Sequence, residues 1–502
     1  MSAIKKLLSD TVIYGLTTII SRVLNFLLTP FFTLSLETSL YGIFTNLYAY
    51  AAMINAVLAF GMETTYFRYL QRVEKEDKEK VFNNSFVVTL FATVVFVGSM
   101  FVFAKPIASF IKSVDLDLEE YIVFVKFFAV ILAADALAVV PFARLRAEGR
   151  PIRYSTIKII NILVLVFCNL FLLFWLPSLV KEYTFWQNIS SGWFRNGWLG
   201  NVFISNLIAS LVTLVMLIPQ ILKFSFKIDM ALLRSMLNYS FPILIANISF
   251  IINEHLDKMM FPKLVPTADG ERDLGIYGAV AKLAIFLNLF VTAFRLGAEP
   301  FFFSYAKNQN AKQVYAKIME YFIIAMVLVM IGLCANISWL KNFIRGGELT
   351  AEVYWTGLYI VPILLFNNVL LGIYMNLSIW YRLSDQTRYG LYISVVGAII
   401  TVILNVALIP TYSYLGAALS TTLTYFVMVT MSYCLGQKNY QIPYNVLKSF
   451  FYLILAIIST ALMYYVFNNN LLLSNALLIV VIGLVFYLER NFIKSVAVKL
   501  KK

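Results

Sequence analysis

Histidine, cysteine and charged residues are all scarce in this sequence. His255 is the single histidine, and Cys168, Cys334 and Cys434 lie in or beside apolar segments without paired spacing. These residues support neither a disulfide framework nor a metal site, and they exclude most histidine-based catalysis. Only 13% of the 502 residues are charged, whereas 61% are hydrophobic. This balance is typical of an integral membrane protein.

Long polar loops are also missing. The longest loop that we expect on the outer side, about residues 177–198, is too short to fold as a catalytic domain. The formal net charge is +14, but the basic residues are spread through short loops and form no domain that would hold nucleic acid. We therefore expect a protein that is not an enzyme, uses no cofactor and binds no nucleic acid.

Apolar runs long enough to cross a membrane fill most of the chain. A hydrocarbon core of about 30 Å needs about 20 apolar residues in a helix, and about fourteen runs satisfy this length. The sequence therefore predicts an all-α membrane protein. The expected spans are 11–34, 41–62, 85–104, 121–142, 155–176, 199–222, 238–261, 276–303, 319–340, 353–379, 389–410, 415–435, 449–467 and 471–488.

Lysine and arginine predict the orientation, because short loops rich in these residues stay on the cytoplasmic side. They gather on the side shared by both termini, for example in the cluster at 144–153, which holds four arginines. Residues 1–10 carry two lysines and no small-residue cleavage site, so we expect a retained first helix rather than a signal peptide. The sequence predicts a multi-pass protein with both termini in the cytoplasm.

An internal repeat is visible at an offset of 236 residues. The tripeptide Leu-Tyr-Gly at 40–42 matches Ile-Tyr-Gly at 276–278, and Gly-Met-Glu at 61–63 matches Gly-Ala-Glu at 297–299 without a gap. Helix two therefore resembles helix eight. The alternative is a chance match between apolar stretches of similar composition.

A true repeat predicts two six-helix lobes related by a pseudo-twofold axis along the membrane normal, with a substrate site between them near mid-membrane. We expect an N-lobe at 1–225 with helices 1–6 and a C-lobe at 226–440 with helices 7–12. Residues 441–502 would form helices 13 and 14 and a cytoplasmic tail outside the repeat.

Basic residues inside the spans are candidate substrate ligands. A charge at the bilayer centre costs at least about 2.5–3.5 kcal/mol, so it should face a partner or a water-filled cavity. Arg22 lies near the middle of the first span, with no acidic residue three or four positions away. It either pairs with a carboxylate on another helix or binds an anion in a central cavity. The repeat offset relates Arg22 to Lys258, and Lys282 is a further candidate.

Helix seven carries a charged cluster near its expected outer end. Glu254, Asp257 and Lys258 share one face, and Glu254 can pair with Lys258 one turn away. His255 titrates near neutral pH and is a candidate proton sensor, although a lone histidine is more often structural. The cluster is either a gate or ion-coupling site, or a solvated group at the membrane edge.

Helix eight carries a second candidate gate. Arg295 and Glu299 lie one turn apart near its cytoplasmic end, so we expect a self-paired gate or an interface bridge. Lys126 and Asp135 on helix four either line the cavity or extend toward the membrane surface.

Four segments of the chain resemble the polysaccharide flippases of the multidrug/oligosaccharidyl-lipid/polysaccharide exporter superfamily. They are Ser-Leu-Tyr-Gly-Ile at 39–43, Arg-Leu-Arg-Ala-Glu-Gly-Arg-Pro at 144–151, Ala-Phe-Arg-Leu-Gly-Ala-Glu-Pro-Phe-Phe at 293–302, and the basic N-terminus leading into the first helix. The tract at 21–26 is similar to one in the related lipid II flippases, where its arginine lies in a cationic cavity. Leu28 and Thr29 stand where that branch has an arginine and an aspartate, which favours a surface-polysaccharide unit over lipid II.

The resemblance implies a flippase in the bacterial inner membrane. Its substrate would be an undecaprenyl-pyrophosphate-linked oligosaccharide repeat unit, moved to the outer face by alternating access for O-antigen, lipopolysaccharide or exopolysaccharide synthesis. Arg22, Lys258 and Lys282 would be substrate ligands. The expected partners are the lipid-linked oligosaccharide and membrane lipids, and a polysaccharide polymerase or glycosyltransferases are compatible with them.

Two other classes remain open. A drug or organic-cation antiporter of the same superfamily would favour an acidic cavity, whereas basic residues predominate here. A polytopic polysaccharide polymerase or ligase would need an acid/base or metal site, which the short loops and the single histidine disfavour. A scaffold without transport activity is compatible with the same sequence.

Overall fold

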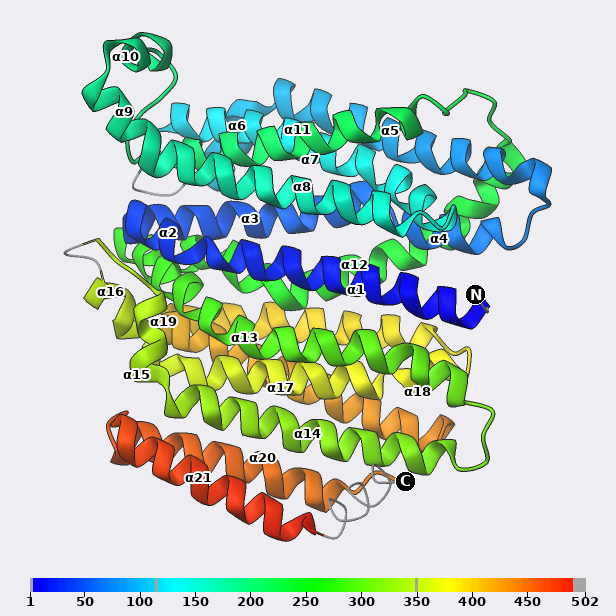
Figure 1. The fold of residues 1–502 in the computed structure, drawn as a ribbon, viewed down its shortest axis with the longest axis vertical. Coiled ribbons are helices and arrows are strands. Elements are labelled where there is room, and N and C mark those ends of the chain that lie inside the picture. The colour runs from blue at the N-terminus through cyan, green and yellow to red at the C-terminus, as the bar shows by residue number, and fades with distance from the viewer. Residues whose placement is uncertain (1–2, 113–115, 348–350, 491–502) are drawn as a thin grey trace. The chain divides into compact units, whose positions relative to one another are not determined.

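The computed structural model describes residues 3–112, 116–347 and 351–490, and within these ranges all regular secondary structure is helical (Figure 1). Contacts divide the chain into two compact units. The first contains Met1–Ala279, Arg345–Ala351 and Arg388–Thr424, and the second contains Val280–Ile344, Glu352–Thr387 and Tyr425–Lys502. The all-α fold predicted from the apolar runs is confirmed.

The helices before residue 265 all belong to the first unit. In chain order they are α1 (Ala3–Leu27), α2 (Thr29–Ser35), α3 (Thr38–Ala59), α4 (Met62–Leu70), η1 (Lys75–Asp77), α5 (Lys78–Val102), α6 (Ala104–Ile111), α7 (Leu118–Ala147), α8 (Pro151–Leu170), η2 (Phe171–Trp175), α9 (Leu176–Glu182), α10 (Thr184–Ser190), α11 (Gly200–Ile221) and α12 (Met230–Leu264).

The later helices lie mainly in the second unit, and α13 and α19 pass from one unit to the other. They are α13 (Ala268–Tyr305), α14 (Ala311–Ala335), α15 (Ile337–Leu340), η3 (Lys341–Phe343), α16 (Ala351–Trp355), η4 (Thr356–Ile360), α17 (Val361–Leu377), α18 (Ile379–Leu383), α19 (Arg388–Asn439), α20 (Val446–Ala461), η5 (Leu462–Val466) and α21 (Leu471–Leu488).

Thirteen helical segments of the described chain are long and apolar enough to span a membrane. One of them, α19, has 52 residues, a length of about 78 Å at 1.5 Å per residue, which is more than twice the hydrocarbon thickness. It is broken at Ser413, where φ is 49° and ψ is −131°. Two predicted spans, 389–410 and 415–435, therefore lie on either side of one kink, and the fourteen predicted spans are accounted for.

Helix α7 lies at the centre of the first unit and packs against α5, α6 and α11. Its buried Phe124 and Phe128 meet Phe203 of α11 with ring centroids 5.0 and 4.9 Å apart. Tyr48 of α3 joins this group through Phe128. Interlocking aromatic rings of this kind supply close packing where lipid provides no hydrophobic drive between helices.

Helix α3 and the first turns of α13 approach closely at glycines. A β-carbon added to Gly42 would lie 2.0 Å from the carbonyl oxygen of Glu271, and one added to Gly275 would lie 1.9 Å from that of Thr38. Gly278 is similarly close to the Thr45 side chain. Small residues let transmembrane backbones meet in this way, so any side chain here would push the helices apart.

In the second unit, α14 packs against α17, α20 and α21. Lys448 of α20 donates hydrogen bonds to Glu320 of α14 and to Glu489, just after α21, with a distance of 2.8 Å to Oε2 of Glu489. Tyr452 also donates to Glu489, at 2.7 Å. This network fixes the last two spans to α14.

The predicted lobe boundaries at residues 225 and 440 do not coincide with the edges of the compact units, since α12 and the first third of α13 belong to the first unit. The assignment of helices to repeat-related lobes stays a prediction. The expected cytoplasmic tail after residue 490 lies outside the described residues.

Candidate functional site

A polar stripe runs along α1. Thr18, Ser21, Arg22 and Asn25 follow the spacing i, i+3, i+4, i+7, which places them on one helix face. Arg22 and Asn25 are exposed, and the other two are partly buried. The sequence argument found Arg22 alone, and the helical spacing of its polar neighbours was the signal that would have shown the stripe.

The other exposed residues of α1 are apolar and lie on a different face. Leu16, Ile20 and Leu27 are 53%, 41% and 45% exposed, and their helical positions lie far around the axis from Arg22. Between the two faces, buried Thr17 donates to Ser155 of α8 at 2.7 Å. Since exposed apolar side chains suit lipid, the separate exposed polar face calls for water or a polar ligand within the membrane.

Lys258 is held by the residue beside it. Its Nζ lies 3.0 Å from both carboxylate oxygens of Asp257 and 3.1 Å from the carbonyl oxygen of Glu254. The hydroxyl of Tyr277 donates to the same carboxylate at 2.6 Å. The side chain of Asp257 is only 5% exposed and that of Lys258 19%, so the two charges neutralise each other inside the first unit.

This geometry corrects the expected partner of Lys258. The predicted ion pair with Glu254 is replaced by the pair with Asp257, and Glu254 contributes its main-chain carbonyl instead. The Glu254 carboxylate lies 4.0 Å from Nε2 of His255, and both side chains are partly exposed. The charged cluster is therefore divided into two pairs of adjacent residues: Asp257 with Lys258, which is largely buried, and Glu254 with His255, which is partly exposed.

A chain of uncharged polar groups lies nearby in sequence on α12. The side-chain amide of Asn253 donates to the carbonyl oxygen of Ser394 at 3.2 Å, and its oxygen accepts from Thr401 at 3.1 Å. Thr401 also contacts Thr424 at 3.2 Å. These groups are buried, so their bonds join α12 to both halves of the kinked α19, a link that hydropathy alone gave no means of predicting.

A further acidic residue, partly buried, lies in α7. Asp135 accepts a hydrogen bond from Ser210 of α11 at 2.9 Å and interacts electrostatically with Lys158 of α8. Lys126, on the same helix, is exposed. Lys158 lies two turns inside α8, and the sequence argument did not identify it among the charges within the spans.

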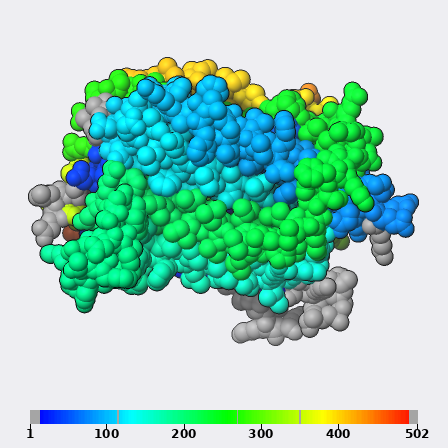
Figure 2. All heavy atoms as spheres, turned by 90° about the horizontal axis from the view of Figure 1, so that it is seen from above, coloured from blue at the N-terminus to red at the C-terminus, as the bar shows by residue number. Residues whose placement is uncertain are grey.

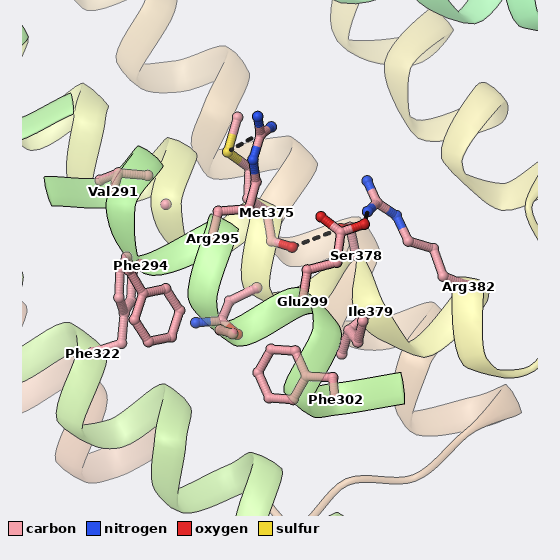
Figure 3. Close-up of a pocket in the computed structure, with 13 residues that line it drawn as sticks. Val291, Phe294, Arg295, Glu299, Phe302, Phe322, Met375, Ser378, Ile379 and Arg382 are labelled. Atoms are coloured by element: carbon pink, nitrogen blue, oxygen red, sulfur yellow. Dashed lines mark hydrogen bonds and ion pairs between the residues drawn. The ribbon is translucent and has the colours of Figure 1, made fainter. Parts of the chain in front are cut away.

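An open pocket in the second unit contains both residues of the predicted helix-eight gate. Its space between α13, α14, α17 and α18 amounts to about 370 Å³, which includes the part open to solvent. Phe294, Phe302 and Phe322 line it together with Arg295 and four charged or polar neighbours (Figure 3). Its walls are mainly apolar, and its charged groups stand on one side (Figure 3).

Glu299 has a different partner from the one predicted. Nη1 of Arg382 donates to its carboxylate at 2.7 Å, whereas Nη1 of Arg295 lies 3.9 Å from the sulfur of Met375 (Figure 3). The expected bridge between Arg295 and Glu299 is thus replaced by one that joins the end of α13 to α18. The two charged side chains are 38% and 41% exposed.

The same arrangement occurs in the first unit at the repeat offset. Arg146, at the end of α7, forms an ion pair with Glu63 in the first turn of α4. Glu63 and Glu299 are 236 residues apart, and so are Arg146 and Arg382. Two ion pairs that match at both partners are hard to reconcile with a chance similarity of apolar segments.

A further pair of positions follows the offset. Asn169 and Asn405 are 236 residues apart in the sequence and are both fully buried. The remaining candidate, Lys282 on α13, is partly buried. Among the residues that the structure describes, no group of three His, Cys, Asp or Glu side chains is arranged to hold a metal ion.

Known proteins were compared with the chain by sequence and by fold. The profile of the family described as "Polysaccharide biosynthesis protein" matches residues 7–306, and that of the MatE family matches residues 242–407. No curated protein sequence matches the chain.

Solved structures show the same fold at low sequence identity. The lipid II flippase MurJ in an inward closed conformation has a TM-score of 0.73 and 15% identity, over 96% of this chain and 100% of its own. A multidrug resistance MATE transporter in an inward-facing conformation has a TM-score of 0.66 and 12% identity, over 83% and 94%. A transporter from Pyrococcus furiosus with a binding pocket of reverse polarity has a TM-score of 0.53 and 12% identity, over 90% of this chain and 96% of its own.

These findings place the chain among multi-pass membrane proteins with the two-lobe helical fold of these transporters. The polysaccharide profile alone spans more than half of the 502 residues. The chain therefore belongs to the polysaccharide biosynthesis protein family.

Proposed function

We propose that this protein is a flippase that moves undecaprenyl-pyrophosphate-linked oligosaccharide repeat units across the bacterial inner membrane. The observation that carries the proposal is the polar stripe on α1, where exposed Arg22 lies inside a span of a polysaccharide-family protein. The likeness to the lipid II flippase over 96% of the chain supports the same class of cargo.

The cargo explains why a polar face is needed within a membrane. Each unpaired hydroxyl group moved into an apolar medium costs several kcal/mol, and a pyrophosphate costs far more. A wet, cationic path lowers this barrier while the isoprenoid tail remains in lipid. In this proposal, Arg22 binds the pyrophosphate through its planar guanidinium, which matches phosphate oxygens with paired donors.

Lys258 has a different position in the proposal. Its ammonium group is already paired with Asp257, so it would bind the pyrophosphate only in a state where that pair opens. Lys282 remains a candidate ligand from its place on α13. The neighbouring Glu254 and His255, the Asp257 carboxylate, and Arg295 with Glu299 remain candidates for gating or ion coupling.

The proposed orientation follows from the distribution of basic residues. With both termini in the cytoplasm, the cluster at 144–153 lies where the lipid-linked substrate is made. Six helices per lobe and alternating access complete the scheme. The cargo would enter from the cytoplasmic face and leave on the outer face.

An organic-cation antiporter is the second candidate, and the MatE match at residues 242–407 favours it. Asp135, a partly buried carboxylate within a span, is the kind of group that such a transporter would use to bind a cation. The two candidates predict opposite cargo charges, so transport itself distinguishes them.

The test is transport by the purified protein in liposomes. A fluorescent polyprenyl-pyrophosphate oligosaccharide is added to the membrane, and its appearance in the opposite leaflet is measured with a membrane-impermeant quencher. Protein-dependent flipping supports the proposal. Export of ethidium without flipping of the lipid would overturn it in favour of the antiporter.

A further inference from the structure

The segment between α8 and α11 is unusually aromatic. It contains η2, α9, α10 and the turns up to Trp198, and four of the seven tryptophans of the chain lie in it, at 175, 186, 193 and 198. We call residues 171–198 the aromatic hairpin. Figure 1 shows α9 and α10 beyond the end of α8 that is opposite the N-terminus of α1, and Figure 2 shows them in blue-green as a projection of the first unit.

Helix α10 of the aromatic hairpin has two unlike faces. Phe185, Trp186 and Ile189 fall within one arc of the helix, whereas Thr184, Gln187 and Asn188 fall on the other side. Phe185 is 65% exposed and Ile189 49%. A short helix with an apolar face left open to its surroundings needs an apolar environment to cover that face.

The location of α10 indicates what covers this face. Leu163 and Phe167 form an exposed apolar stripe on α8, at 51% and 56% exposure, and this stripe lies on a membrane span. The stripe continues through Phe171, whose ring is 5.9 Å from that of Trp186. Helix α10 therefore contacts η2 at the point where the exposed stripe of α8 ends.

Polar contacts hold the other end of the aromatic hairpin to the helical bundle. Nε1 of Trp198 donates to Glu120 at 2.6 Å, and Arg195 forms an ion pair with the same carboxylate near the start of α7. Exposed Trp193 and Tyr183 lie between this attachment and α8. Tryptophan and tyrosine with a mixed polar face are typical of the headgroup region of a bilayer.

We infer that the aromatic hairpin lies in the lipid interface of the leaflet opposite the N-terminus, with Phe185, Trp186 and Ile189 inserted among the acyl chains. It anchors the end of α8 to the membrane surface. This inference concerns the lipid partner of an unassigned surface and does not rest on the cargo proposed above. A docking protein is the other occupant that such a surface fits, and the contact of Trp186 with Phe171, where the exposed stripe of a membrane span ends, favours lipid.

Site-directed spin labelling of the full chain in phospholipid vesicles tests this placement. Labels are attached to Phe185→Cys and Ile189→Cys, with Gln187→Cys as the matched control on the opposite face of α10, after the native cysteines are replaced by alanine. Collision rates are measured with oxygen, which concentrates in lipid, and with a water-soluble nickel complex. We expect the labels at 185 and 189 to show a several-fold higher ratio of oxygen to nickel collisions than the label at 187.

Equal ratios at all three positions would overturn the inference, as would higher nickel accessibility at 185 and 189. In either case the surface is open to water in a pure lipid membrane, and a protein partner becomes its occupant. Trp193→Cys supplies a fourth label outside α10, so that a defect in folding of the short helix is distinguished from a wrong placement. A high ratio of oxygen to nickel collisions at position 193 as well as at position 185 supports the inference.

Discussion

Asp257 and Lys258 are neighbours in the chain, yet their ion pair depends on residues far away. The pair sits in a nearly closed environment with Tyr277 as a third partner, and the backbone carbonyl of Lys258 accepts from Asn46 of α3 at 2.7 Å. Burial makes each charge costly alone, so neither is dispensable while the other remains.

Removing one partner of this pair should therefore destabilise the protein. We expect Lys258→Met to lower the free energy of unfolding by about 3 kcal/mol, the lower end of values for broken buried pairs, because it leaves Asp257 uncompensated. The double variant Asp257→Asn/Lys258→Met should recover most of the loss. Denaturant unfolding in micelles measures both, and Glu254→Gln is the control because only its carbonyl contacts Lys258. A Lys258→Met variant with the same free energy of unfolding as wild type would contradict the account.

A second residue-scale prediction concerns pH. Partial burial raises the pKa of Glu148, but Arg144, Lys223 and Arg150 outweigh it and hold that pKa below the ordinary value of 4.5. A lowered folded-state pKa stabilises the fold above the ordinary value and loses this effect as pH falls through the folded pKa. Glu148→Gln should thus be less stable than wild type at neutral pH and equal to it in strong acid. The melting temperatures of both proteins, measured from neutral pH to strong acid, test this prediction. A difference in melting temperature that does not change with pH would refute it.

At the residue scale, the sequence identified charges but not their partners. Arg22, Asp257 and Glu299 stand out because charges are rare in apolar spans. Their partners lie 20 residues or more away in two cases, Tyr277 for Asp257 and Arg382 for Glu299. Helical periodicity favours partners one full turn away, which is why Arg295 was assigned to Glu299, and Glu254 rather than the adjacent Asp257 to Lys258.

The helices were predicted more completely than the partners of the charged side chains. Each apolar run corresponds to a helix, because an unpaired backbone inside lipid is too costly for any other structure that stays within one segment. The helices extend beyond the runs, as in α12, which covers 230–264 where 238–261 was predicted. Hydropathy ends where the side chains become polar, whereas backbone hydrogen bonding continues into the interface. The short α9 and α10 were missed for the same reason.

The close approach of α3 and α13 yields an element-scale prediction. Gly42→Ala should lower the free energy of unfolding by about 1–3 kcal/mol, because the new methyl group meets a backbone carbonyl that has no rotamer to move. Gly98→Ala in α5 is the control, since a β-carbon there meets nothing within 4 Å. Unfolding of the two variants under the same conditions decides the question. Equal stability would mean that the two helices separate at little cost.

At the scale of the whole molecule, the predicted repeat is supported by two matched ion pairs. The ion pairs Glu63–Arg146 and Glu299–Arg382 follow the same 236-residue offset. Each glutamate comes two positions after a glycine and pairs with an arginine 83 positions later. The offset applied to Arg146 points directly to Arg382, so the second pair was available from the sequence once the first was known.

Equivalent pairs should respond alike to mutation. Each is partly exposed, so its loss should cost no more than about 1 kcal/mol of stability. We expect Glu299→Arg to slow lipid translocation through repulsion from Arg382, and Glu299→Arg/Arg382→Glu to restore it. The matched variants Glu63→Arg and Glu63→Arg/Arg146→Glu should behave in the same way. Rescue in one pair and not in the other would contradict functional equivalence of the repeats.

The central claim is that the exposed cation on α1 binds the anionic head of the cargo. The most direct measurement compares translocation of a polyprenyl-pyrophosphate oligosaccharide in liposomes by wild type, Arg22→Ala and Arg22→Lys, with Lys126→Ala as the control for loss of an exposed intramembrane cation. The account predicts that Arg22→Ala folds but loses most activity, that Arg22→Lys retains part of it, and that Lys126→Ala resembles wild type. Full activity of a folded Arg22→Ala variant would contradict the claim.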